Sequence, residues 1–239
     1  MIIFADYDNI DALAKGRGLE HIILKTITAI SGLRVAPQPR IDIRFYGGWF
    51  YGTQLSRLGQ ELSSEIGRTF PKPLTLPWTG QPKPITVLVN AHIARSLTAS
   101  EQQPLHHTFR RRPFSGRLYF RRPIPAQCPT TSCPLDVVEQ FLATQKCPEA
   151  RCAITQSDIL DRCEQKLVDT MLVSDLIFWS SRPNHPLLAV LSSDDDMWPG
   201  IRTAMAISRP IIQIHTSRSP QHQTYVNRLD QNSYLQANF

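Results

Sequence analysis

Short apolar runs that alternate with longer amphipathic stretches constrain the fold of this chain most strongly. We expect strands over residues 1–9, 40–50, 84–94, 186–193 and 210–216, because these runs are rich in Ile, Val, Leu and Phe. Strands that alternate with helices require crossover connections, which make neighbouring strands parallel and place helices on both faces of the sheet. The pattern therefore predicts the α/β class with a mostly parallel sheet.

The stretches between these runs have the apolar spacing of helices. We expect helices over residues 19–31, 52–67, 158–179 and 196–207, the last interrupted early by Pro199. Cys163 lies within the third of these stretches. We expect its side chain to belong to the core.

The alternation stops between residues 98 and 153, where proline, arginine and cysteine become frequent. We interpret residues 98–153 as an insertion into one domain made of residues 1–97 and 154–239. A chain of 239 residues with 41% hydrophobic content can bury one sizeable core and a small appendage.

The amino-terminal sequence and the length of the apolar runs favour a cytoplasmic protein. No apolar run approaches the roughly 18 residues that a membrane helix needs. The chain begins with Asp6 and Asp8 where a signal peptide would carry basic residues. We therefore expect no membrane partner.

Arginines concentrate the net charge of +6 in the insertion, where residues 102–135 contain no Asp or Glu. Six of them are candidate nucleic-acid contacts: Arg110, Arg111, Arg112, Arg117, Arg121 and Arg122. Their planar guanidinium groups suit phosphate, and the interleaved aromatic side chains could stack on unpaired bases. The alternative is a solvated loop or hairpin whose arginines only keep it soluble.

Four cysteines of the insertion form two C-x4-C pairs, each with proline after the first cysteine. They are Cys128, Cys133, Cys147 and Cys152. Paired thiolates on two short turns can close a tetrahedral Zn²⁺ site, around which a segment with little core could fold. Disulfides, which a cytosolic location disfavours, and unbound thiols are the alternatives.

Acidic residues follow the first and the fourth expected strands. Asp6 and Asp8 leave the first strand, whereas Asp194, Asp195 and Asp196 leave the fourth. The carboxyl ends of parallel strands meet at one edge of a sheet, where α/β proteins bind their ligands. Carboxylates gathered there repel one another unless a cation neutralises them.

Hard oxygen ligands of this kind select Mg²⁺ or Mn²⁺. Such an ion can activate water and stabilise charge on a phosphodiester, so the acids indicate a metal-dependent nuclease. The alternative is that these aspartates only cap the helices that follow the strands.

Three stretches together resemble the NYN domains of the PIN-like nuclease superfamily. They are Asp6 with Asn9 after the first strand, "KLVDTMLVSD" at residues 166–175, and "VLSSDDDMWP" at residues 190–199, which is similar to the family's S-G-D-S-D-F strand end. The likeness covers roughly residues 1–70 and 155–216.

The resemblance implies a PIN-like (Rossmann-like) fold and an endoribonuclease that favours RNA over DNA. It implies metal-binding roles for Asp6, Asp169, Asp194 and Asp196, orienting roles for Asn9 and Ser192, and a nucleic-acid contact for Lys166.

The chain departs from the family at Ser193, where the family has glycine, and at Met197, where it has phenylalanine. The insertion is not part of the family's minimal domain. The insertion therefore leaves the identity of the substrate undetermined. Binding of a protein partner or formation of a homo-oligomer through the insertion also stays open.

Two other functions stay open. "FADYDN" at residues 4–9 also resembles the start of haloacid dehalogenase-type phosphatases, in which Asp6 would be a covalent nucleophile, Asp8 the acid and Lys166 a phosphate partner. That assignment leaves Asp169 without a role, and the arginine-rich insertion suits a polymer better than a small ester. The third candidate is a nucleic-acid-binding module without catalysis.

Overall fold

The computed structural model describes residues 1–114, 116, 118, 134–207, 210–216 and 234–239. The chain divides into two compact units. The first comprises Met1–Phe109 with Gln165–Phe239, and the second comprises Arg110–Glu164. We had expected the insertion to span residues 98–153.

A seven-stranded sheet forms the centre of the first unit, in the order β11-β10-β9-β1-β2-β6-β5. Every neighbouring pair is parallel except β5 and β6, which are antiparallel. The strands are β1 (Ile2–Asp6), β2 (Arg40–Tyr46), β5 (Lys72–Leu76), β6 (Ile85–Ile93), β9 (Leu188–Leu191), β10 (Ile211–His215) and β11 (Tyr234–Asn238). The α/β class with a mostly parallel sheet is confirmed.

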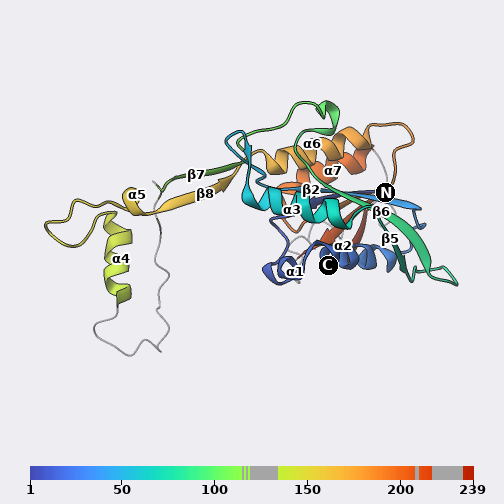
Figure 1. Ribbon diagram of the computed structural model, residues 1–239, viewed down its shortest axis with the longest axis horizontal. Coiled ribbons are helices and arrows are strands. Elements are labelled where there is room, and N and C mark those ends of the chain that lie inside the picture. The colour runs from blue at the N-terminus through green and yellow to red at the C-terminus, as the bar shows by residue number, and fades with distance from the viewer. Residues whose placement is uncertain (115, 117, 119–133, 208–209, 217–233) are drawn as a thin grey trace. The chain divides into compact units, whose positions relative to one another are not determined.

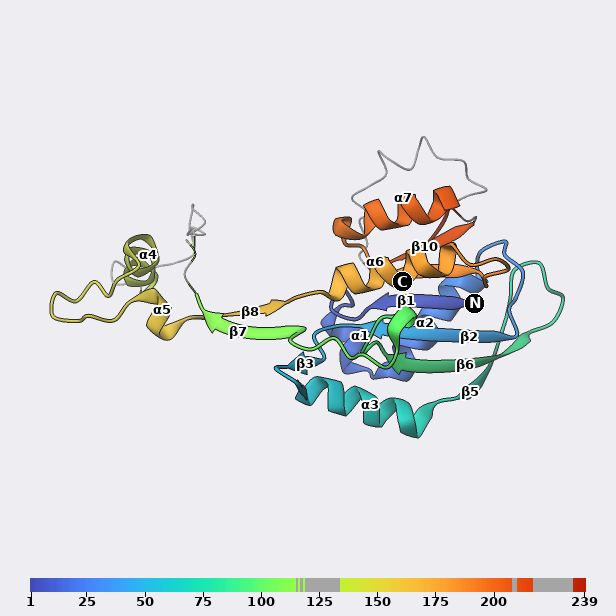
Figure 2. The same ribbon diagram turned by 90° about the horizontal axis from the view of Figure 1, so that it is seen from above.

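Helices cover both faces of this sheet (Figures 1 and 2). One face packs on α2 (Leu19–Ser31) and α3 (Arg57–Thr69), near the short α1 (Ala12–Gly16), and the other packs on α6 (Val168–Ser180) and α7 (Trp198–Ile207). Because successive side chains of a strand point to opposite faces, Ile3 lies in the first core and Phe4 in the second. A strand buried on both faces reads as a continuous apolar run.

The helix expected over residues 52–67 begins later than its spacing predicted. Two short strands, β3 (Phe50–Tyr51) and β4 (Gln54–Leu55), pair antiparallel around Gly52, whose φ is 61°. The side chain of Ser56 then accepts a hydrogen bond from the Gly59 backbone N–H and so caps α3 at 3.1 Å. A turn that needs glycine and an N-cap serine explain the shift.

The helix expected over residues 158–179 is wrong in its first half. Residues Asp161–Gln165 form the strand β8, and α6 starts only after Leu167, whose φ is 67°. Cys163 is exposed on β8, so it is not a core residue. The strand is mostly exposed on both faces and therefore carries no apolar alternation that would distinguish it from a helix.

Several other elements also differ from expectation. The edge strands β5 and β11 were not expected, and β11 extends the sheet in parallel beside β10. A 3₁₀ turn, η2 (Asp195–Met197), precedes α7. Pro199 lies in the first turn of α7 rather than interrupting it, because the first turn needs no N–H from proline. A further 3₁₀ turn, η1, spans Thr98–Ser100.

The second unit contains α4 (Pro134–Thr144), α5 (Gln156–Ile159), β8 and most of β7 (Phe109–Pro113). Arg111 of β7 forms an ion pair with Asp161 of β8 at 2.5 Å, and the Phe114 backbone N–H donates to the Leu160 carbonyl at 2.8 Å. These contacts hold the two segments that begin and end the second unit side by side.

Candidate active site

Asp6 and Ser192 lie together at the carboxyl ends of β1 and β9. Asp6 is 4% exposed, and its Oδ2 accepts a hydrogen bond from Ser192 Oγ at 3.0 Å. Its Oδ1 accepts from the backbone N–H groups of Asp8 (3.2 Å) and Asn9 (3.4 Å). Ser192 Oγ in turn accepts from the Asp194 N–H at 3.0 Å. Parallel pairing of neighbouring strands brings these predicted site residues together.

Asn9 holds the loops after three neighbouring strands. Its Oδ1 accepts hydrogen bonds from the Ser193 backbone N–H, at 2.8 Å, and from the hydroxyl of Thr216, which follows β10. Because both donors use the same amide oxygen, Asn9 positions the loops. Thr216 is a member of this arrangement that the sequence did not suggest.

Three further acids of the candidate site come from two other elements. Asp169 belongs to α6, and Asp194 and Asp196 belong to the turn at η2. Asp169 lies in the first turn of α6, and Asp194 caps η2 by accepting the Asp196 N–H at 3.0 Å. Burial, followed by the charges of Asp194, Asp196 and Asp8, raises the pKa of Asp169. Asp194 therefore caps η2, as the alternative interpretation of these acids expected, and its charge also acts on Asp169.

The buried Asp6 carboxylate carries the largest electrostatic penalty of the group. Burial raises the pKa of Asp6 to about 6; the Ser192 hydrogen bond opposes this rise, and the charges of Asp8 and Asp169 add to it. Desolvation also raises the pKa of Asp8, although the Gln165 side chain, Lys15 and the Gly48 backbone favour its ionised form. These acids are therefore held together against their mutual repulsion.

Asp8 was not among the predicted metal ligands, yet its charge reaches both Asp6 and Asp169. The D-x-D spacing at residues 6–8 is the signal that could have included it. Gly47, directly after β2, allows the Asp8 carboxylate and the Trp49 ring to lie close to its backbone. A Cβ at Gly47 would lie 2.8 Å from the Trp49 ring and 3.2 Å from Asp8 Oδ2.

The chemistry of these donors fits a divalent cation. Carboxylate oxygens are the ligands that Mg²⁺ and Mn²⁺ prefer. Burial, and to a smaller extent the charges of neighbouring acids, raises the pKa values of Asp6 and Asp169, and a cation would favour their ionised forms. Across the described ranges, no three Asp, Glu, His or Cys side chains are grouped closely enough to hold an ion as they lie.

Asp175, which is part of the "KLVDTMLVSD" likeness, lies elsewhere. It is 1% exposed; its Oδ2 accepts from the Tyr46 hydroxyl at 2.7 Å, and its Oδ1 accepts from the Thr98 N–H at 2.7 Å. Arg44 Nε lies 3.1 Å from the same Oδ2. Asp175 thus connects α6 to β2 as a buried structural residue.

The predicted nucleic-acid contacts fall on different elements. Lys166 is exposed just before α6, and its backbone N–H donates to the Thr108 carbonyl at 2.9 Å. Arg110, Arg111 and Arg112 lie on β7, where Arg111 pairs with Asp161. Arg117, Arg121 and Arg122 lie outside the described residues.

Two of the four predicted zinc ligands can be placed. Cys147 and Cys152 are partly exposed free thiols on one short turn, in which the Cys152 N–H donates to the Glu149 carbonyl at 2.9 Å. Cys128 and Cys133 lie outside the described residues, so the tetrahedral zinc site stays a prediction.

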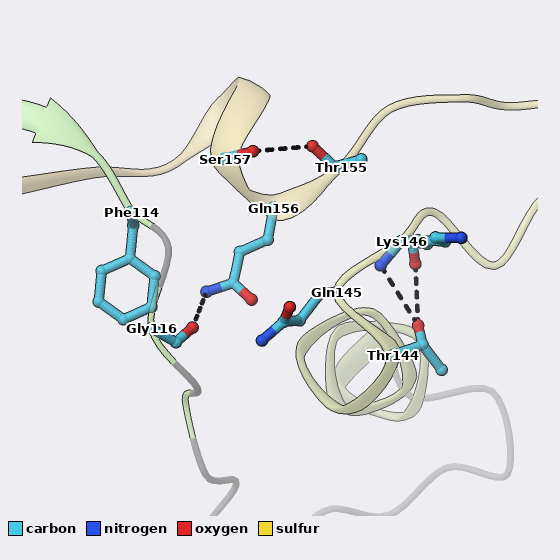
Figure 3. A pocket seen from close by; sticks show the side chains of 8 residues that line it. All are labelled: Phe114, Gly116, Thr144, Gln145, Lys146, Thr155, Gln156 and Ser157. Carbon is cyan, nitrogen blue, oxygen red and sulfur yellow. Dashed lines mark hydrogen bonds between the residues drawn. The ribbon is translucent and has the colours of Figure 1, made fainter.

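The second unit also contains a pocket of about 280 Å³ (Figure 3). Its lining residues are Phe114, Gly116, Thr144, Gln145, Lys146, Thr155, Gln156 and Ser157. The buried Gln156 donates from Nε2 to the Gly116 carbonyl at 3.2 Å, whereas its Oε1 has no hydrogen-bond partner. No Asp, Glu, His or Cys lines this pocket, whereas acidic side chains gather at the carboxyl edge of the sheet.

Within the part of the chain that the structure describes, no helix has the length and apolar character to cross a membrane. Comparison of the chain with protein-family models, with curated proteins and with solved structures found no match.

Proposed function

We propose that this chain is a metal-dependent nuclease that hydrolyses phosphodiester bonds, with RNA as its preferred substrate. The observation that carries the proposal is the gathering of acids from β1, η2 and α6 around a buried Asp6 whose pKa is raised to about 6. The likeness to NYN domains supports the same assignment and a PIN-like arrangement of the sheet. Such clustering of like charges is costly, and a cation-dependent site explains it.

Asp6, Asp169, Asp194 and Asp196 would hold the cation. When bound, the ion would activate water and stabilise the charge that develops on a phosphodiester. Ser192 fixes the orientation of Asp6 by donating to its Oδ2, and Asn9 keeps the loops after β1, β9 and β10 in register. These two residues limit how far the acids can separate.

The described basic and aromatic residues favour a polymer as the substrate. Arg110 and Arg112 flank the paired Arg111 on β7, and Phe109 begins the same strand. Arginine forks bind successive phosphates, and aromatic rings stack on unpaired bases. Lys166, next to the start of α6, adds a charge near Asp169 in sequence.

The phosphatase assignment is less consistent with the geometry of Asp6. A covalent nucleophile needs an accessible carboxylate oxygen, whereas Asp6 is 4% exposed and both of its oxygens accept hydrogen bonds. The wild-type chain should therefore form no acid-stable, base-labile phosphoryl adduct on Asp6 when small phosphate esters are supplied.

A cleavage assay tests the proposal. Labelled single-stranded RNA, duplex RNA and DNA are incubated with the full chain in Mg²⁺, in Mn²⁺ and in excess EDTA. We expect cleavage of RNA that stops in EDTA and in Asp194→Asn. Asp42→Asn, near the amino end of β2 and so away from the carboxyl ends of the strands, should cleave normally. Undiminished cleavage in EDTA, or no cleavage of any polymer with either metal, would contradict the proposal.

A further inference from the structure

A second hollow of the first unit lies at the carboxyl ends of β10 and β11, beside α1 and the start of α2. Its volume is about 430 Å³. Its lining residues are Asp11, Leu13, Ala14, Arg17, His21, Lys25, Thr216 and Phe239. We call it the Arg17 pocket.

Two cationic side chains, Arg17 and Lys25, line this pocket together with the imidazole of His21. His21 and Lys25 are four residues apart on α2, which places them on one side of the helix, and Arg17 follows the end of α1. The one Asp or Glu side chain that lines the pocket, Asp11, accepts the Ala14 N–H at 2.8 Å and caps α1. This hydrogen bond, and to a smaller extent the charge of Lys25, lowers the pKa of Asp11. Among the described residues, no ion pair joins Arg17 or Lys25 to a carboxylate. The pocket therefore has positive charge to offer an anion.

An apolar surface accompanies these charges. Leu13 is 82% exposed, and Lys25 Nζ lies 4.1 Å from the centroid of the Phe239 ring. Exposed leucine and an aromatic ring offer a surface on which a base or a sugar can pack, beside cations that bind phosphate. This combination suits a nucleotide unit better than a free inorganic anion.

Two hydrogen bonds connect the Arg17 pocket to the acidic site. Thr216, which lines the pocket, donates its hydroxyl to Asn9 Oδ1. The backbone N–H of Asn9 donates to Asp6 Oδ1 at 3.4 Å. A nucleic-acid strand with one phosphodiester at Asp6 can therefore continue along the same edge of the sheet, past the end of β10, into the pocket.

We infer that the Arg17 pocket binds a backbone phosphate of single-stranded nucleic acid whose neighbouring phosphodiester occupies the acidic site. This inference rests on the proposed function, because that function supplies the polymer. Arg17 and Lys25 contact the phosphate, and Leu13 and Phe239 contact the attached nucleoside. The pocket thus fixes the position of the strand relative to Asp6 without taking part in bond cleavage.

The test compares two charge-matched variants in EDTA, where binding is measured without turnover. Arg17→Ala/Lys25→Ala should weaken the affinity for single-stranded RNA. It should also make the slope of log affinity against log salt shallower by about 0.7, since the pocket contacts one phosphate and each phosphate contact on a single strand contributes about 0.7. Arg34→Ala/Lys83→Ala, in the connections that lead into β2 and β6, should leave both quantities unchanged. All four side chains are exposed, so thermal melting should confirm that both variants fold.

Unchanged affinity and slope in Arg17→Ala/Lys25→Ala would overturn the inference, and so would an equal loss in the control pair. A second readout locates the contact. The imidazole NMR signals of His21 should shift with a 5′-phosphorylated trinucleotide. An equal shift with inorganic phosphate at the same concentration would overturn the nucleotide assignment.

Failure of this inference can be told apart from failure of the proposed function. If the wild type never cleaves RNA but binds it through the Arg17 pocket, the nuclease proposal fails and the inference stands. If the wild type cleaves RNA in Mg²⁺ and the pocket variant binds it as well as the wild type does, only the inference fails.

Discussion

The Ser192 hydroxyl lies 3.0 Å from Oδ2 of Asp6, to which it donates, and joins two residues that are 186 positions apart in the sequence. The same hydroxyl oxygen accepts the Asp194 N–H at 3.0 Å. One fully buried serine therefore fixes both a buried acid and the turn that carries Asp194, Asp195 and Asp196.

Ser192→Ala should destabilise the fold and raise the pKa of Asp6 further, because it removes a hydrogen bond that lowers that pKa. We expect a loss of about 1–3 kcal/mol, since a buried acceptor and a backbone N–H lose their partner. Denaturant unfolding in EDTA measures it. Ser64→Ala, at an exposed position of α3, should change stability by less than about 0.5 kcal/mol. Equal losses in the two variants would contradict the role of Ser192.

Asp6→Asn should stabilise the metal-free fold at neutral pH. The folded protein holds a proton on Asp6 up to about pH 6, whereas the unfolded chain releases it near the ordinary pKa of 3.8. Stability should therefore fall as pH rises from about 4 to about 6 and stay level above this window, for a total near 3 kcal/mol.

The variant lacks this titration, so its stability curve should be flatter across the same window, and its melting temperature at pH 7 should equal or exceed that of the wild type. Thermal unfolding from pH 4 to pH 8 in EDTA checks both statements. A large drop in melting temperature at pH 7 would show that the ionised carboxylate is structurally required.

Asp175→Ala and Asp169→Ala form a matched pair on α6 with opposite expected effects. Removing Asp175 leaves Arg44 as an uncompensated buried charge, which should cost about 3–5 kcal/mol. Removing Asp169 relieves repulsion from Asp194 and Asp196, so stability should hold or rise while cleavage is lost. Chemical unfolding and the cleavage assay on both variants separate the roles. Equal stability of the two would refute the assignment of Asp175 as structural.

Changing Arg110, Arg111 and Arg112 to alanine should weaken RNA binding. The salt slope should become shallower by up to about 2, which corresponds to three phosphate contacts on a single strand. The exposed Arg111–Asp161 pair contributes little stability, so the fold should survive. High RNA concentration should restore much of the turnover, because the arginines supply binding rather than transition-state stabilisation.

A control variant with Arg57, Arg68 and Lys83 changed to alanine loses the same charge from the first unit. The affinity of both variants for RNA, measured at several salt concentrations, shows whether the β7 arginines bind the substrate. An unchanged affinity and slope in the β7 variant would remove these arginines from the path of the substrate.

The paired cysteines should bind one zinc ion per chain. Elemental analysis of protein purified without chelator should find zinc, and Cys147→Ser or Cys152→Ser should reduce its content. Cys163→Ser is the matched control, because Cys163 is exposed on β8 and outside the two C-x4-C pairs. Absence of zinc from the wild type would leave the cysteines as ordinary thiols.

Much of the first unit follows from local patterns in the sequence. The bounds of α2 match the expected residues 19–31, because apolar side chains recur there at helical spacing. The central strands could be predicted equally well from the sequence, since burial on both faces produces unbroken apolar runs. In contrast, β5 contains Pro73 and pairs along only one edge, a position where proline is tolerated and the usual strand signal is weak.

The candidate site could be predicted in part because parallel topology makes strand ends converge. Asp6 and Ser192 meet for that reason. Thr216 and Gln165 could not be predicted, because a lone threonine or glutamine carries no motif and acquires its role only from its neighbours in space. The burial of Asp175 was equally hidden, since its partners Arg44 and Tyr46 lie far away along the chain.

The hydrogen bond between the Lys166 N–H and the Thr108 carbonyl has a consequence for how such a chain can be altered. The polypeptide leaves the first unit at Phe109 and returns at Gln165, and these two positions are next to the two hydrogen-bonded residues. A tight turn could join the two strands there in place of residues 110–164, without changing the order of the seven-stranded sheet. Recombination at this junction would therefore exchange one accessory module for another while the architecture that holds Asp6, Asp169 and Asp194 persists.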